Sequence, residues 1–372
     1  MSDNSSKTIE IGDISVKPGE KCQFRHEVTT TYHGDPVEIP VTIINGLHDG
    51  PRIFLSAAVH GDELNGIKVV QEVAQRYDPM EIHGSIICIH VLNVPGFLKQ
   101  QRYVPISDED LNRSFPGKKH GTLANRLAYS IFTELISICD LGIDLHTSTR
   151  KRTAMYHVRA DMRDPRVERV ARAVGTSMIL DSEGSDGTLR KVACKHDIPT
   201  VTIEMGRAHR FQSTHYGRAI RCIDNVLAEH EIQPAHSVMW PGWRRVVARG
   251  GEKRWIRAET GGLVQREWGL YPFVEVGEPL FSITDHFMND IEIVSAPFTG
   301  LVVGVLESPV VYPGHPLCLF VRIRESTADI IREDIQKGEF DVYLEGGFQW
   351  SNPERHSEAD RYHIDDSRDQ PV

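Results

Sequence analysis

The chain of 372 residues is 40% hydrophobic with a formal net charge of −10, which allows a full buried core and argues against a nucleic-acid partner, since binding a phosphate backbone needs a basic surface. The N-terminus lacks the charged and then apolar pattern of a secretory signal, and no apolar run approaches the roughly 20 residues that span a bilayer. The six cysteines are scattered without a CxxC pair, which indicates reduced thiols. We therefore expect a globular cytoplasmic protein that binds neither nucleic acid nor a membrane, and we leave homo-oligomers open.

Strands and helices alternate up to about residue 230. The apolar run IFLSAAV at 53–59 follows a turn signal and indicates a strand that is buried on both faces. Further buried strands are predicted at 85–92, 141–145 and 200–204, and helices at 67–77, 123–136, 165–175 and 215–230. This alternation predicts an α/β fold with a mixed, largely parallel sheet that helices cover.

The composition changes after Pro234, where helical periodicity gives way to short β segments rich in Gly and Pro up to about residue 324. The segment 258–283 matches the segment 296–320, which indicates two β halves of one origin that pack together. The repeat resembles the two halves of a biotinyl or lipoyl carrier domain. However, Asn289 stands where the modified lysine would be, so we expect no carrier role.

These patterns divide the chain into three parts. Residues 1–238 are predicted to form the catalytic α/β domain, and residues 239–325 an all-β domain of barrel-sandwich-like architecture. Residues 326–372 are acidic and poor in apolar residues, so we predict a partly disordered tail.

Three polar segments lie at the ends of buried strands. His60 and Glu63 follow the first strand, His146 follows LGIDL, and Glu204 ends TVTIE. Since open α/β sheets bind their ligands outside the carboxyl ends of the strands, these side chains are predicted to converge.

Two imidazoles and a carboxylate are the usual ligands of a catalytic zinc ion that keeps one position open for water. We therefore predict one Zn²⁺ per chain at His60, Glu63 and His146, with a pair of hydrogen-bonded core histidines as the structural alternative. Glu204 beside the metal is suited to move a proton from water to the leaving nitrogen of an amide. Its structural alternative is a surface glutamate that ends a strand.

The segment RYVPISDEDLNRSF places Arg102 and the pair Asn112 and Arg113 in a loop between a strand and a helix. The planar fork of arginine suits a developing oxyanion or a substrate carboxylate, whereas a surface ion pair is the ordinary role of a loop arginine. The polar loop 181–191 is equally compatible with a pocket wall and with a plain surface loop.

The segments AAVHGDELNG, QRY, DLNRSFPG, DLHTS and TVTIEMG occur in an order that resembles the succinylglutamate desuccinylase/aspartoacylase family, a branch of the zinc carboxypeptidase fold. The resemblance covers about residues 40 to 325. It implies that His60, Glu63 and His146 bind zinc, that Glu204 is the general acid and base, and that Arg102 polarises the scissile carbonyl. It also implies that Asn112 and Arg113 hold a substrate carboxylate and that Asp144 orients a metal ligand.

The leading hypothesis is therefore zinc-dependent hydrolysis of the amide bond of a small N-acyl amino acid, which is not an ordinary peptide bond. Neither the acyl group nor the amino acid follows from the sequence. A metallocarboxypeptidase that acts on short peptides or glutamyl tails uses the same residues and is the first alternative. A catalytically inactive binding module is the second, although Glu204 is present in its expected context.

Overall fold

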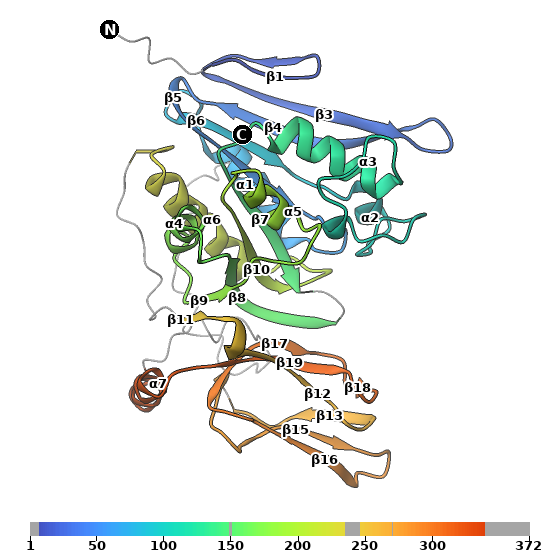
Figure 1. Cartoon of the computed structure of the whole chain (residues 1–372), viewed down its shortest axis with the longest axis vertical. Helices are drawn as coiled ribbons and strands as arrows, with labels where there is room; N and C mark the ends of the chain where they lie inside the picture. The colour runs from blue at the N-terminus through green and yellow to red at the C-terminus, as the bar shows by residue number, and fades with distance from the viewer. Residues whose placement is uncertain (1–6, 149–150, 235–245, 270, 339–372) are drawn as a thin grey trace, which may run out of the picture.

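A large mixed sheet forms the centre of the molecule (Figure 1). The computed structural model describes residues 7–148, 151–234, 246–269 and 271–338. The four central strands are parallel and lie in the order β10, β7, β5 and β6. Their bounds are Thr200–Arg207, Leu141–Ser148, His48–Ala57 and His83–Ile89. Antiparallel neighbours flank them, with β4 (Pro36–Asn45) and β3 (Glu20–Thr30) on one side and β8 (Arg152–Ala160) on the other.

Helices cover both faces of this sheet, as the sequence predicts. Alternate residues of β5 point to opposite faces, so that Ile53 and Leu55 join one apolar cluster and Phe54 joins the other. The helices α1 (Asn65–Arg76), α4 (Pro165–Ala173) and α6 (Ser213–Glu229) pack into the first cluster. The helices α3 (Leu123–Ser130) and α5 (Leu189–Lys195) pack into the second, together with a π-helical turn at Ile131–Ile136. The prediction of a mixed α/β sheet covered by helices is confirmed.

Short elements complete this part of the chain. They are β1 (Ile9–Ile11), β2 (Ile14–Val16), α2 (Val94–Leu98), a 3₁₀ turn at Leu111–Arg113 and β9 (Met178–Asp181). The helix starts follow from local sequence. For example, the side chain of Asp164 accepts a hydrogen bond from the backbone N–H of Arg166, and Pro165 occupies the first position of α4.

The C-terminal β region confirms that the two repeated segments fold alike and pack together. The first half contains β13 (Gly262–Arg266), β14 (Phe273–Val274) and β15 (Pro279–Thr284), and the second contains β17 (Gly300–Leu306), β18 (Val310–Val311) and β19 (Pro316–Arg322). The short middle strand of each half pairs with a strand of the other half: β14 pairs with β17, and β18 pairs with β13. The remaining strands are β11 (Val246–Ala248), β12 (Lys253–Arg257) and β16 (Asp290–Ser295), and a 3₁₀ turn lies at Gly250–Glu252.

The C-terminal β region is continuous with the large sheet. Strand β17 pairs antiparallel with β8, with Gly304 opposite Ala154, so the sheet continues from one part of the chain into the other. The predicted boundary at 238/239 and the last 34 residues lie outside the described residues. The start of the predicted tail forms the helix α7 (Glu325–Lys337), which packs against the sheet through Ala328 and Ile331. Among the described residues, no helix is long and apolar enough to cross a membrane.

Candidate active site

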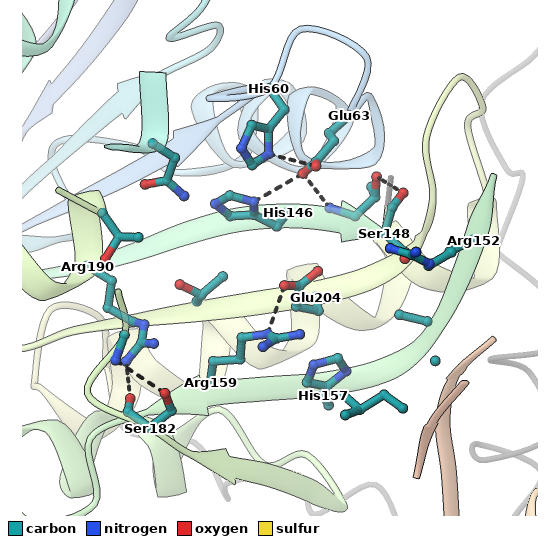
Figure 2. A pocket seen from close by; sticks show the side chains of 18 of the residues that line it. His60, Glu63, His146, Ser148, Arg152, His157, Arg159, Ser182, Arg190 and Glu204 are labelled. Carbon is teal, nitrogen blue, oxygen red and sulfur yellow. Dashed lines mark hydrogen bonds and ion pairs between the residues drawn. The ribbon is translucent and has the colours of Figure 1, made fainter. Parts of the chain in front are cut away.

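Three neighbouring strands bring the predicted metal ligands and Glu204 to one place. His60 and Glu63 follow β5, and His146 on β7 lies directly opposite Glu204 on β10. The three strands adjoin in the order β10, β7 and β5, as the strand-end argument requires. Figure 2 shows the two imidazoles and the Glu63 carboxylate turned toward one another above Glu204.

His60, Glu63 and His146 form a compact and buried set of donors. Their exposed fractions are 4%, 1% and 5%, and one ligand atom from each lies within 4.8 Å of the others. Nδ1 of His60 is 2.7 Å from one oxygen of Glu63, and Nδ1 of His146 is 3.1 Å from the other. The backbone N–H of Thr147 also donates to the Glu63 carboxylate over 2.8 Å.

A second carboxylate sets the orientation of His146. Nε2 of this ring lies 2.7 Å from Asp144, whose other oxygen accepts a hydrogen bond from the Ser56 hydroxyl. A proton on Nε2 that is donated to Asp144 leaves the lone pair of Nδ1 for a metal ion. Nε2 of His60 likewise lies 3.3 Å from a carboxylate, that of Asp110.

The electrostatics of the three donors agree with a cation site. Burial raises the pKa of Glu63, but the two imidazoles outweigh this effect and leave that pKa well below its ordinary value. Burial lowers the pKa of both histidines, yet Glu63 with Asp110 outweighs it at His60, and Asp144 with Glu63 outweighs it at His146, so both pKa values are raised. Two imidazole nitrogens and one carboxylate at this spacing fit the donor set of a catalytic zinc ion.

Arg102 lies beside the donors. One guanidinium nitrogen is 2.8 Å from Asp110 and another is 3.6 Å from Glu63. Asp110 also accepts a hydrogen bond from the backbone N–H of Asn112, which ties the loop to the arginine. The predicted placement of Arg102 near the site is therefore found.

Asn112 and Arg113 line the same pocket. The Asn112 side-chain oxygen accepts a hydrogen bond from the backbone N–H of Leu189 over 2.8 Å, which joins the loop to the first turn of α5. Arg113 donates to the backbone oxygen of Asn112 over 2.6 Å. Because that bond holds its own loop, the remaining N–H groups of the guanidinium are the ones that suit a ligand.

Glu204 lies in the wall of the pocket. Its side chain is 14% exposed, and one carboxylate oxygen is 2.9 Å from Nε of Arg159 on β8 (Figure 2). A glutamate held in this way is not a plain surface residue. It is available to a ligand that enters beside His146.

Residues 49–230 match the succinylglutamate desuccinylase/aspartoacylase catalytic domain. The chain belongs to this family. It is a family of deacylases and desuccinylases, which hydrolyse the amide bond of acyl amino acids. Membership therefore supports an enzyme.

Two relatives illustrate the sequence similarity. The chain is 32% identical to the N-alpha-acetyl-L-2,4-diaminobutyric acid deacetylase of Halomonas elongata over 114 residues, which cover 31% of this chain and only 33% of that protein. It is 24% identical to a succinylglutamate desuccinylase of Pseudomonas aeruginosa over 255 residues, which cover 61% of this chain and 73% of that protein.

Solved structures share the fold. The product-bound ectoine utilization protein EutE (DoeB) of Ruegeria pomeroyi superposes with a TM-score of 0.74 at 20% identity, over 87% of this chain and all of that one. A succinylglutamate desuccinylase/aspartoacylase from Rhodobacter sphaeroides gives 0.74 at 23% identity, over 86% of this chain and all of that one. The similarity extends beyond residue 230 and so takes in the C-terminal β region.

In this member of the family, the pocket has a volume of about 420 Å³ and draws its walls from distant parts of the chain. Trp255, Val303 and Leu319 of the C-terminal β region line one side. The polar loop 181–191 lines another side through Ser182 and Thr188, among others. It is therefore a pocket wall and not a plain surface loop.

Several pocket residues were not predicted from the carboxyl ends of the buried strands. Arg190 is 6% exposed, donates to the backbone oxygen of Ser182 over 2.5 Å and forms no ion pair with any described residue. Burial lowers the pKa of its guanidinium. Arg159 and His157 lie two apart on β8, on the face that carries Glu204 on the adjoining strand. That two-residue alternation of polar side chains in an apolar strand is the signal that could have identified them.

Proposed function

We propose that the protein hydrolyses the amide bond of a small N-acyl amino acid with one zinc ion held by His60, Glu63 and His146. The single observation that carries this proposal is the buried set of two imidazoles and one carboxylate beside a further acid, Glu204. A zinc ion bound there would lower the pKa of its water from about 16 to about 7 and polarise the scissile carbonyl.

Glu204 is proposed as the general acid and base. It lies opposite His146 on the adjoining strand and lines the same pocket, which supports a role for its carboxylate beside the water and the amide. It takes a proton from the attacking water and passes it to the nitrogen as the C–N bond breaks, which gives a carboxylic acid and a free amine. The ion pair with Arg159 holds the carboxylate in position for both transfers.

Arginines are proposed to bind the anionic parts of the reaction. Arg102 lies close enough to the metal donors to donate to the oxyanion that develops on the carbonyl. Arg113, with Asn112, lines the pocket and is proposed to hold the substrate carboxylate. Five arginines line the pocket against two glutamates, so a ligand with one or more carboxylates is favoured.

The alternative is a metallocarboxypeptidase that acts on short peptides or glutamyl tails. The same residues serve that reaction, but two of the similar proteins, a deacetylase and a desuccinylase, support acyl amino acids. Trp255 and its neighbours line one side of the pocket, and we propose that this wall limits the length of a ligand. The cytoplasmic location and any homo-oligomer stay predictions.

A panel of substrates tests the proposal. Free-amine release is measured with zinc-loaded protein on N-acetyl and N-succinyl amino acids and on dipeptides with a free C-terminus. We expect release from at least one N-acyl amino acid and none with Glu204→Ala. Cleavage of dipeptides alone would favour the carboxypeptidase, and an active Glu204→Ala protein would contradict the assigned acid and base.

A further inference from the structure

His157 is a buried polar side chain that the proposed reaction does not use. It lies on β8, is 1% exposed and forms part of the pocket wall (Figure 2). His157 is directly opposite Glu204 on β10, and Glu204 is in turn opposite His146 on β7. Residues opposite each other on adjoining strands project from the same face of a sheet. The three side chains therefore form a row across the sheet with Glu204 in the middle.

The hydrogen bonds of His157 fix which of its nitrogens carries the proton. Nδ1 is 2.8 Å from the backbone oxygen of Met155, which can only accept, so Nδ1–H is the donor. Burial, together with the positive charge of Arg159, lowers the pKa of His157 to about 4, so the ring is neutral near pH 7.

Nε2 of the neutral ring is therefore a hydrogen-bond acceptor. It is buried and has no partner among the described residues. Buried polar atoms in native proteins almost always have a partner, so an acceptor left open in the wall of a pocket is suited to a ligand.

The position of His157 indicates which part of a substrate can reach it. The scissile bond must lie between Glu204 and the zinc ligands, because Glu204 exchanges protons with both water and the leaving nitrogen. His157 is on the opposite side of Glu204 from His146. A group that contacts His157 therefore extends beyond the scissile bond, as the amino-acid side chain and the acyl chain do.

We propose that Nε2 of His157 accepts a hydrogen bond from an N–H or O–H group of the substrate, and that it thereby selects N-acyl amino acids that carry such a donor beyond the amide bond. This inference rests on the proposed function. A methyl group at that place leaves Nε2 without a partner. A carboxylate is repelled, because its oxygens and Nε2 are all hydrogen-bond acceptors. Both groups are therefore disfavoured. The donor can belong to the amino-acid side chain or to the acyl group.

Two matched pairs of substrates distinguish these sources. N-acetyl-2,4-diaminobutyrate and N-acetylnorvaline differ by an ammonium or a methyl group at the end of the side chain. N-glycolylnorvaline and N-propionylnorvaline differ by a hydroxyl or a methyl group at the end of the acyl chain. The value of kcat/KM for amine release is measured on all four, with wild type, His157→Leu and His157→Gln. His90→Gln is the matched control, since His90 bonds to Thr42 outside the pocket.

The wild type and His90→Gln are expected to prefer the donor by about tenfold or more in one pair, because the member with the methyl group leaves a polar atom of the site unpaired. His157→Leu should abolish that preference, and His157→Gln should restore much of it through its amide oxygen. The assignment is overturned by a wild type without preference in either pair, by a preference that survives in His157→Leu, or by an equal loss on both members of each pair.

Failure of the proposed function gives a different result, because no amine is then released from any of the four compounds. The role of His157 is still decided by calorimetric binding of 2,4-diaminobutyrate against norvaline, and of glycolate against propionate, to zinc-loaded wild type and His157→Leu. Tighter binding of the donor by the wild type alone supports the assignment. Equal affinities in both proteins overturn it.

Discussion

Gly61, the residue after His60, lies where the chain has no room for a side chain. A Cβ built on Gly61 would be 2.0 Å from the carbonyl carbon of Gly96 and 2.2 Å from the backbone nitrogen of Phe97, whereas ordinary contacts begin at 3.4 Å. Both obstacles are backbone atoms within α2, so neither can rotate away. In Gly61→Ala the two segments must therefore separate by about 1.4 Å.

This displacement should weaken metal binding as well as the fold. Overpacking costs about 1–3 kcal/mol, while metal sites tolerate only about 0.2 Å of error in ligand distances. Since Gly61 is covalently joined to His60, we expect the affinity for zinc to fall at least about tenfold in Gly61→Ala. Chelator competition measures that affinity, and urea unfolding measures stability on the same samples.

Gly217 provides the matched control, because a Cβ at this position of α6 has no atom within 4 Å. Gly217→Ala should bind zinc like the wild type and be no less stable, since alanine favours a helix by about 1 kcal/mol over glycine. A Gly61→Ala protein that binds zinc with wild-type affinity would show that the backbone contact with α2 does not control the position of His60. So would an equal loss of zinc affinity in both variants.

Three further predictions concern the support of the site and the fold. Asp144→Asn removes the carboxylate that holds His146, so chelator competition should show about 10- to 100-fold weaker zinc binding, and an unchanged affinity would contradict that role. Tyr77→Phe removes the hydroxyl that donates to the buried carboxylate of Asp224 between α1 and α6, so the free energy of unfolding in urea should fall by about 1–3 kcal/mol, and no loss would contradict the bond. Burial lowers the pKa values of His157 and His215 to about 4, so between pH 6.5 and 4 the unfolded chain binds protons that the folded chain does not. As the pH decreases over this range, the free energy of unfolding should therefore decrease by up to about 3 kcal/mol for each residue. In urea unfolding, the free energy of unfolding of the double variant His157→Gln/His215→Gln should depend less on pH.

The sequence predicts the convergence of these polar side chains well because they follow a general rule of α/β sheets. Each of His60, His146 and Glu204 adjoins an apolar run long enough to be a buried strand, and parallel strands bring their carboxyl ends to one edge. Loop residues such as Arg102 could be placed near the site only through the resemblance. No spacing in the loop specifies its contact with Glu63.

His157, Arg159 and Arg190 could not be predicted in the same way. His157 and Arg159 face the pocket because β8 runs antiparallel to β10 and places them opposite its end, and that pairing depends on tertiary structure. Arg190 is buried by the packing of α5, although its sequence context is that of an exposed polar loop.

The sequence also gave no indication of how the C-terminal β region joins the large sheet. The repeated β segments predict a unit that packs on itself, which they form. Nothing in the pattern of β17 indicates that its second edge pairs with β8 and so continues the large sheet. The edge strand on which a second sheet docks is set by the three-dimensional arrangement and leaves little local signal.

The most direct test of the central claim measures zinc content and amine release on the same preparations of wild type, His146→Ala and Glu204→Gln. We predict that His146→Ala loses both properties, whereas Glu204→Gln keeps its zinc and loses turnover by about 100-fold or more. Turnover that survives in Glu204→Gln, or zinc and turnover that survive in His146→Ala, would contradict the central claim.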